Sequence, residues 1–253
     1  MRGMSAHTFI ITRPVEDAGR FSAAARAAGA RVIAMPVIDI HFREQVQIPD
    51  VRWQAVAITS ANGARAIGRL PAAQRQAITA AQAVTVGPAS SAAARMAGFA
   101  RILQAAGDVA ALIETVRQRL RPQDGPILYA SGAITRGDLQ RHLNAAGFDV
   151  HRAVLYEARP AGMLNEAARK ALLNDAPGTV ALYSPRSASI WAQLVQQAGL
   201  AAQAARWRHA CLSSNVAHAL RRHLPGCEQA LTAAEPREEA LLAMLGLTLE
   251  KES

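Results

Sequence analysis

The sequence has few cysteines and few aromatic residues, and it contains no long apolar run. Cys211 and Cys227 are the only two cysteines in 253 residues, which excludes a disulfide-rich scaffold and favours reduced thiols. No apolar run is long enough to span a bilayer, and the N-terminal residues lack the apolar core of a secretory signal. Because aromatic residues make up only 4% of the chain, aliphatic side chains and alanine must fill its core. We therefore predict a cytoplasmic protein with no membrane-spanning segment.

The familiar catalytic and cofactor motifs are also missing. The chain has no G-x-G-x-x-G, H-E-x-x-H, C-x-x-C or G-x-S-x-G pattern, so these dinucleotide, zinc, redox and hydrolase sites are excluded. The stretch at 132–139 has the glycine spacing of a Walker A loop, but Asp138 stands where a lysine is required. The seven histidines are scattered, and we expect no metal site. A cofactor-free enzyme and a binding protein remain as candidates.

The chain has an excess of positive charge. Its 28 Lys and Arg residues exceed its 19 Asp and Glu residues and give a formal net charge of +9, which favours an acidic partner. The arginines are spread along the chain without interleaved aromatic residues, unlike the usual nucleic-acid footprint. A small polyanionic ligand fits this charge at least as well. Salt-dependent binding to random DNA would distinguish a nucleic-acid-binding protein.

Short apolar segments alternate with alanine-rich helical patterns along the whole chain. Most of these segments are apolar throughout, as expected for parallel strands that helices cover on both faces. Several predicted helices end at a glycine, for example Gly29 and Gly147. This alternation predicts an α/β protein with parallel sheets. The predicted strands are 8–12, 31–35, 54–59, 82–86, 101–104, 126–130, 149–157, 179–183, 209–212 and 227–231.

Four pairs of similar segments recur in the same order in the two halves of the chain. VAITSANGARAIGRL, which contains Ser60, resembles VALYSPRSASIWAQL, which contains Ser184. The other pairs are 26–38 with 144–156, 84–96 with 210–222, and 103–116 with 231–244. We interpret the chain as a duplicated α/β unit that forms two domains with a cleft between them, where ligand sites commonly lie.

Small polar residues follow several of the predicted strands. Ser60, Ser184 and Ser213 are each placed to cap a helix by accepting a hydrogen bond from a free N–H group. Arg13 and Arg186 lie near similar helix ends and can pair with anions. Helix N-termini at the carboxyl ends of parallel strands suit carboxylate or phosphate binding. The four strand-to-helix joins are TSAN (59–62), GPASS (87–91), YSPRS (183–187) and SSNV (213–216).

Taken together, the motifs resemble the uroporphyrinogen-III synthase family over residues 8–245. They are ITRP near the start, AITSANGARA, VTVGPASSAAARMAGF, ILYASGAITRGDLQRHLNAAGFDVHRAVLYEARP and VALYSPRSASIW. The resemblance implies two flavodoxin-like parallel-sheet domains that face each other across a cleft and are joined by a two-stranded linker. The implied domains are 1–38 plus 159–253 and 41–155, with linker strands at about 36–42 and 154–160.

The resemblance also implies a reaction. This family cyclises hydroxymethylbilane, a linear tetrapyrrole with eight carboxylates, to uroporphyrinogen III with inversion of ring D and loss of water, and it uses no cofactor. The implied catalytic residue is Tyr156 on the second linker strand. Ser60 and Ser184 match family serines whose joins line the cleft, and Ser90 stands where the family often has threonine.

Two positions depart from the family pattern. Asn62 replaces the usual arginine or proline-arginine pairing of its turn, and SSNV at 213–216 replaces a GPTT-like turn. These departures affect the expected substrate contacts of Asn62 and Ser213 rather than the fold. The resemblance implies a monomer with a transient contact to hydroxymethylbilane synthase. The alternative is a hinge-closing two-domain protein that binds a small polyanion without catalysis.

Overall fold

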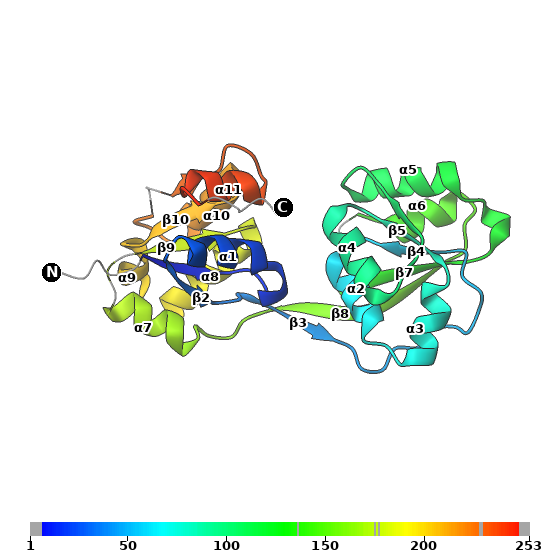
Figure 1. The fold of residues 1–253 in the computed structure, drawn as a ribbon, viewed down its shortest axis with the longest axis horizontal. Coiled ribbons are helices and arrows are strands. Elements are labelled where there is room, and N and C mark those ends of the chain that lie inside the picture. The colour runs from blue at the N-terminus through cyan, green and yellow to red at the C-terminus, as the bar shows by residue number, and fades with distance from the viewer. Residues whose placement is uncertain (1–6, 136, 175, 177, 228–229, 248–253) are drawn as a thin grey trace. The chain divides into compact units, whose positions relative to one another are not determined.

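The computed structural model describes residues 7–135, 137–174, 176, 178–227 and 230–247. The chain divides into two compact units (Figure 1). Unit 1 consists of Met1–Asp39 and Arg159–Ser253, and unit 2 is the continuous segment Ile40–Ala158. The chain passes between the units within strand β3 (Ile38–Phe42) and again within strand β8 (Val150–Pro160). Among the described residues, no helix is both long and apolar enough to cross a membrane.

Unit 1 is built on a five-stranded parallel sheet. Its strands are β1 (Thr8–Ile11), β2 (Arg31–Ala34), β9 (Thr179–Leu182), β10 (Arg208–Cys211) and β11 (Leu231–Thr232), in the order β11-β10-β9-β1-β2. Its helices are α1 (Gly19–Ala27), α7 (Glu166–Asn174), α8 (Pro185–Gln197), α9 (Ala201–Ala205), α10 (Ser214–His223) and α11 (Glu238–Met244), with a 3-10 turn η1 (Val15–Asp17).

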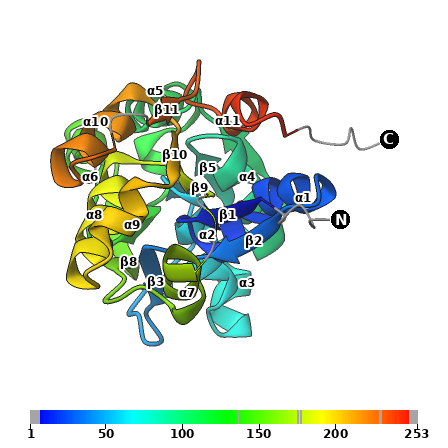
Figure 2. The same cartoon turned by 90° about the vertical axis from the view of Figure 1, so that its left-hand side faces the viewer.

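Two apolar clusters fill the space between this sheet and its helices. Phe9 and Ile11 of β1 pack with α1 and α11, whereas Ile10 packs with α7, α8, α9 and α10 on the opposite face. Figure 2 shows α8, α9 and α10 on one side of these strands and α1 on the other. Coverage of both faces explains why β1 and β9 are buried at every position.

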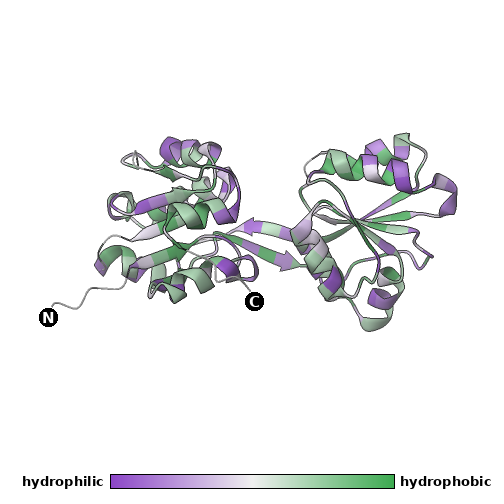
Figure 3. Ribbon diagram, turned by 45° about the horizontal axis from the view of Figure 1, so that its top comes forward, coloured by the Kyte–Doolittle hydropathy of each residue, from purple (hydrophilic) through white to green (hydrophobic). Residues whose placement is uncertain are grey.

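Unit 2 repeats this architecture. Its strands are β4 (Ala55–Ile58), β5 (Gln82–Thr85), β6 (Ile102–Gln104), β7 (Ile127–Gly132), β8 and β3, in the order β3-β8-β7-β4-β5-β6. Its helices are α2 (Ala61–Gly68), α3 (Ala72–Thr79), α4 (Pro88–Ala97), α5 (Val109–Arg119) and α6 (Leu139–Ala145), with a 3-10 turn η2 (Pro122–Asp124). Helices α2, α3 and α4 cover one face, and α5 and α6 cover the other. The apolar residues of both units gather on the strands and the inner helix faces (Figure 3).

Edge strand β3 is antiparallel to β8, whereas β4 to β8 are parallel. The backbone N–H of Arg43 donates to Leu155 O at 2.9 Å, and that of Ala161 donates to Val37 O at 2.9 Å. Residue 43 is thus opposite residue 155, and residue 37 is opposite residue 161. The residue numbers rise along one segment as they fall along the other. This pairing is therefore antiparallel.

The two sheets share one strand order although the chain enters them at different points. Taken in chain order, the strands of unit 1 lie in the order 2-1-3-4-5, as β2-β1-β9-β10-β11. The same arrangement in unit 2 is β8-β7-β4-β5-β6, so β7 and β8 take the places of β1 and β2. The repeat predicted from the sequence aligns β2 with β8, β4 with β9, β5 with β10 and β6 with β11. Each of these pairs occupies equivalent positions, which confirms the predicted repeat.

The sequence located the parallel strands well. Each of the ten predicted segments overlaps a strand, the last of them by one residue, and Gly29 and Gly147 end their helices with φ of +76° and +87°. The predicted strand at 227–231 includes residues 228 and 229, which lie outside the described residues, and β11 begins only at Leu231. These results confirm an α/β fold with parallel sheets.

Candidate functional site

Ser60 and Tyr156 meet at the carboxyl ends of the strands in unit 2. Ser60 follows β4 and caps α2, because its Oγ accepts a hydrogen bond from Gly63 N at 3.2 Å. The Oη of Tyr156, on β8, lies 2.7 Å from the same Oγ. Strand β7 lies between β8 and β4, so the phenol reaches across the end of β7. The sequence predicted both residues as site residues, and the fold brings them into direct contact.

Tyr156 is a protonated phenol at neutral pH. Burial raises the pKa of its hydroxyl, and the hydrogen bond with Ser60 opposes this rise only in part. The side chain is half-buried, so solvent or a ligand can still reach it. Such a hydroxyl can donate a hydrogen bond or a proton to an oxygen, but it is unsuited to act as a base.

The other two predicted residues of unit 2 lie in the first turns of nearby helices. Asn62 is half-buried in α2, and its Oδ1 accepts a hydrogen bond from Arg65 Nη1 at 2.8 Å. Ser90 is buried in α4, with 4% of its surface exposed. The neighbouring Ser91, which the sequence reasoning did not single out, bonds Thr85 Oγ1 at 2.7 Å. Asn62 thus offers its amide N–H₂ to a ligand more readily than its oxygen.

In unit 1, Arg13 is already engaged by a carboxylate. Its Nη1 lies 2.8 Å from Glu238 Oε1, and its guanidinium carbon lies 4.4 Å from the centre of the Tyr183 ring. Burial raises the pKa of the Tyr183 hydroxyl, so the cation stacks on a neutral ring. An anion that binds Arg13 must therefore share it with Glu238 or replace Glu238. Sequence reasoning missed Glu238, whose signal is the acidic pair Glu238 and Glu239 in the first turn of α11, where negative charge is favoured.

Ser184 and Arg186 begin α8 at the end of β9. Ser184 Oγ accepts a hydrogen bond from Ser187 N at 3.0 Å, and Ser187 Oγ accepts one from Ser184 N at 2.9 Å. This reciprocal pair is a capping box, and Pro185 occupies the first helical position. Arg186 is half-buried in the first turn. The predicted role of Ser184 as a helix cap is confirmed.

The predicted side-chain cap by Ser213 is wrong. Ser213 is the N-cap residue of α10, but within the described part of the chain its side chain makes no capping hydrogen bond. Its backbone carbonyl instead accepts hydrogen bonds from Val216 N and Ala217 N at 3.1 and 3.2 Å. The backbone therefore starts this helix, and the hydroxyl of Ser213 takes no part in the cap.

This difference predicts unequal effects of two equivalent substitutions. Ser184→Ala removes the hydroxyl that accepts from Ser187 N and should lower the free energy of unfolding by about 1 kcal/mol. Ser213→Ala removes no capping bond and should change it by less than about 0.5 kcal/mol. Urea unfolding of both variants, followed by circular dichroism, tests this. Equal losses in the two variants would contradict the assignment of caps.

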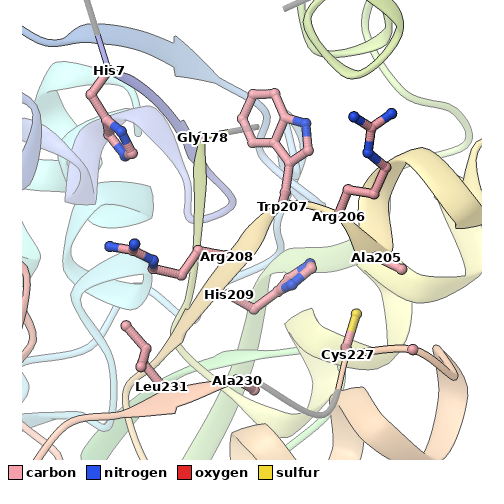
Figure 4. A pocket seen from close by; sticks show the side chains of 11 residues that line it. His7, Gly178, Ala205, Arg206, Trp207, Arg208, His209, Cys227, Ala230 and Leu231 are labelled. Carbon is pink, nitrogen blue, oxygen red and sulfur yellow. The ribbon is translucent and has the colours of Figure 1, made fainter. Parts of the chain in front are cut away.

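A separate cavity opens at the amino ends of β1, β9 and β10 in unit 1 (Figure 4). Its volume is about 710 Å³, and its lining includes His7, Arg208 and His209. Burial lowers the pKa of His209 to about 4, and its Nε2 accepts a hydrogen bond from Trp191 Nε1 at 3.2 Å. His209 is thus a neutral, structural histidine. Ligands of parallel α/β sheets bind at the carboxyl ends, and we assign no function to this cavity.

The described residues contain no group of three or more His, Cys, Asp and Glu side chains that could hold a metal ion. Cys211 and Cys227 are both buried free thiols. Burial raises the pKa of Cys211 to about 12, so this thiol is a poor nucleophile.

The predicted site residues thus form two groups, each at the carboxyl ends of one sheet. Tyr156, Ser60, Asn62 and Ser90 belong to unit 2. The group in unit 1 comprises Arg13, Ser184, Arg186 and Ser213. Arg13, Ser184 and Ser213 follow the neighbouring strands β1, β9 and β10, and Ser60 and Ser90 follow the neighbours β4 and β5, where helix N-termini favour negative charge. Tyr156 lies within β8, across the end of β7.

Comparisons with known proteins point to a single family. The sequence model of uroporphyrinogen-III synthase HemD matches residues 19–243. Uroporphyrinogen-III synthetase from Helicobacter pylori 26695 has a similar structure, with a TM-score of 0.62 and 12% identity over 94% of this chain and 98% of that one. A mutant uroporphyrinogen III synthase from the extremely thermophilic bacterium Thermus thermophilus gives a TM-score of 0.49 and 15% identity over 95% and 97% of the two chains.

No curated protein matches the sequence. The structural match at 12% identity supports the α/β fold, and the match to the family model covers most of the chain. On that second finding, the chain belongs to the uroporphyrinogen-III synthase family.

Proposed function

We propose that this chain is a uroporphyrinogen-III synthase, a lyase that cyclises hydroxymethylbilane with inversion of ring D and loss of water. The observation that carries the proposal is the protonated Tyr156 hydroxyl, 2.7 Å from Ser60 Oγ at the N-terminus of α2. The substrate must lose a hydroxyl group, and this loss needs a proton donor. A partly buried phenol that stays protonated at neutral pH can supply this proton to the leaving hydroxyl without a cofactor.

The proposed step begins with a hydrogen bond from Tyr156 Oη to the hydroxyl of the substrate. The C–O bond breaks, the hydroxyl leaves as water with a proton from the phenol, and an electrophilic methylene remains. Ring D then attacks through its substituted carbon to give a spirocyclic pyrrolenine, and the bond to its original methylene breaks. The ring closes in the inverted sense through its other α-carbon, which loses its proton, and that proton restores the Tyr156 phenol. Because unassisted closure is facile and gives the uninverted isomer, orientation of ring D must contribute more than acid catalysis.

We infer that helix N-termini bind the carboxylates of the substrate. Helices α2, α4 and α10 offer first-turn N–H groups beside Asn62, Ser90 and Ser213. At α8, Ser184 already accepts from Ser187 N, so this helix contributes the positive end of its dipole. Arg13 and Arg186 add positive charge near two of these ends. Arg13 binds a carboxylate of the substrate either by sharing its guanidinium with Glu238 or by exchanging Glu238 for it. The net charge of +9 favours the approach of such a polyanion.

We further propose that the two units are flavodoxin-like domains, since unit 1 has the flavodoxin strand order 2-1-3-4-5 and unit 2 has the same spatial arrangement with a different point of chain entry. The proposed domains are 1–38 plus 159–253 and 41–155. Segments 36–42 and 154–160 would form a two-stranded linker, and the substrate would bind in a cleft between the domains. The proposal includes a cytoplasmic monomer that receives its unstable substrate from hydroxymethylbilane synthase.

The direct test supplies the purified protein with enzymatically generated hydroxymethylbilane, oxidises the products and separates uroporphyrin isomers I and III by chromatography. We expect isomer III to dominate. Isomer I alone, as in a blank without protein, would overturn the proposed function. Retention of the bilane without turnover would instead favour the hinge-closing binding protein.

The charge argument predicts salt-dependent kinetics. Added salt should raise KM several-fold with little change in kcat, because ions screen the attraction between the basic helix ends and the carboxylates. Arg186→Gln should weaken this dependence. Arg95→Gln, in the last turn of α4, should not change it. Initial rates across a potassium chloride series measure the effect, and a flat series would contradict the electrostatic argument.

A further inference from the structure

We propose that Gly132 is a positioning residue for Tyr156: the missing side chain at the end of β7 forms the slot in which the phenol lies. A Cβ atom at position 132 would lie 2.8 Å from Tyr156 Cζ, 2.9 Å from Cε2 and 3.1 Å from Oη. The two carbon distances are shorter than real Cβ contacts, and the distance to the oxygen is tight. Any side chain at this position must therefore displace the ring and its hydroxyl.

The backbone around the slot is fixed, so the ring is the part that must move. A register shift between Ser131 and Gly132 sets Gly132 opposite Tyr156, and Ala133 N donates to Tyr156 O at 2.8 Å. Arg152 Nη2 donates to the carbonyls of Gly132 and Ala133, both at 3.0 Å. These bonds tie the end of β7 to β8 on both sides of the slot.

Position 132 requires a glycine because the ring of Tyr156 fills the space of a side chain, and not because of the backbone conformation. Gly132 is not among the glycines with positive φ, so alanine can adopt its backbone angles. It is the last residue of β7, between β8 and β4. With no side chain there, the ring of Tyr156 passes over β7 and reaches Ser60 on the far side. Gly132→Ala is consequently a test of the slot that introduces no backbone strain.

The slot determines where the hydroxyl lies. A ring displaced by a methyl group loses the 2.7 Å contact with Ser60 Oγ, and the proton donor leaves its place at the helix end. The catalytic part of this inference rests on the proposed function, whereas the packing part does not. A displacement of about 1 Å can cost up to about 10²-fold in rate.

Kinetics test the catalytic part. We expect Gly132→Ala to lower kcat about tenfold or more, to change KM little and to raise the share of isomer I. The same substitution in a Tyr156→Phe background should cause little further loss, because the hydroxyl is already absent. Gly68→Ala is the control, since its Cβ would meet only ordinary contacts at 3.6 Å in the same unit. Full activity of Gly132→Ala, or equal losses in both backgrounds, would overturn the proposal.

Measurements without substrate test the slot itself. Tyrosine labelled at Cζ gives one NMR signal for each of three tyrosines, and Tyr156→Phe identifies the signal of Tyr156. Gly132→Ala should shift that signal and leave the signal of Tyr183 in place. Gly132→Ala should also destabilise the wild type in urea but not a Tyr156→Ala variant, in which no ring fills the slot.

These measurements show whether Gly132 makes room for the ring of Tyr156, even if the substitution weakens folding. An unshifted Tyr156 signal, or equal destabilisation in both backgrounds, would overturn the proposal that Gly132 positions the ring. A wild-type protein that forms no isomer III would instead overturn the proposed function, and the NMR and urea measurements would still decide the role of Gly132.

Discussion

Tyr156→Phe is expected to lower kcat by about 10²-fold, which is within the usual contribution of a positioned proton donor. The substitution removes one oxygen and keeps the ring in its slot, so packing against Gly132 is retained. Ser60 Oγ keeps its bond to Gly63 N, and the cap of α2 survives. KM and the unfolding midpoint should therefore change little. Steady-state kinetics with isomer analysis measure the loss.

Tyr129→Phe is the matched control. Tyr129 lies in the neighbouring strand β7 and is buried, and its hydroxyl is 3.5 Å from Thr59 Oγ1, too far for a strong bond. Its removal should leave kcat within about twofold of the wild type, since this hydroxyl plays no part in the proposed step. If Tyr156→Phe turned over as fast as Tyr129→Phe, Tyr156 would have no part in the chemistry.

Gly178→Ala is expected to cause the largest loss of stability, about 3 kcal/mol from overpacking. A Cβ atom there would lie 2.1 Å from Thr8 O and 2.9 Å from Trp207 Cζ3. Thr8 O belongs to the backbone of β1, and Trp207 is buried in the core of unit 1. Neither group can move without disturbing the sheet. Urea unfolding followed by tryptophan fluorescence measures the change.

Gly162→Ala provides the comparison, because a Cβ at position 162 meets no atom within 4 Å. Its stability should stay within about 0.5 kcal/mol of the wild type. A Gly178→Ala protein as stable as Gly162→Ala would mean that the strands of unit 1 accommodate the methyl group. The close approach of β1 and Trp207 to Gly178 would then be wrong.

Local patterns predicted the strands and most helix starts because these features depend on neighbouring residues. Apolar runs marked strands buried on both faces, such as β1 and β9. The serines that follow β4 and β9 were predicted as caps, and Ser60 and Ser184 do cap helices. Ser213 has the same sequence signal, but its hydroxyl does not bond the helix. Side-chain rotation is not determined by position in the sequence.

Contacts between distant residues could not be predicted in this way. Tyr156 was assigned by resemblance, yet its bond to Ser60 depends on the order β8-β7-β4 and on the empty position at Gly132. Glu238 lies 225 positions from Arg13 and neutralises it. No periodicity links such pairs, because they meet only when the sheet has assembled. The sequence therefore indicated which residues to consider but not which of them touch.

The divided make-up of unit 1 affects how the protein emerges from the ribosome. Phe9 of β1 pairs with Thr179 of β9, which at a synthesis rate of about 5–20 residues per second appears roughly 10–30 s later. Unit 2 is one continuous segment and can complete its own core in that interval. Strand β1 meanwhile lacks its neighbour β9 and exposes apolar surface to other nascent chains. Translation speed and chaperone supply should thus limit the yield of unit 1 before they limit that of unit 2.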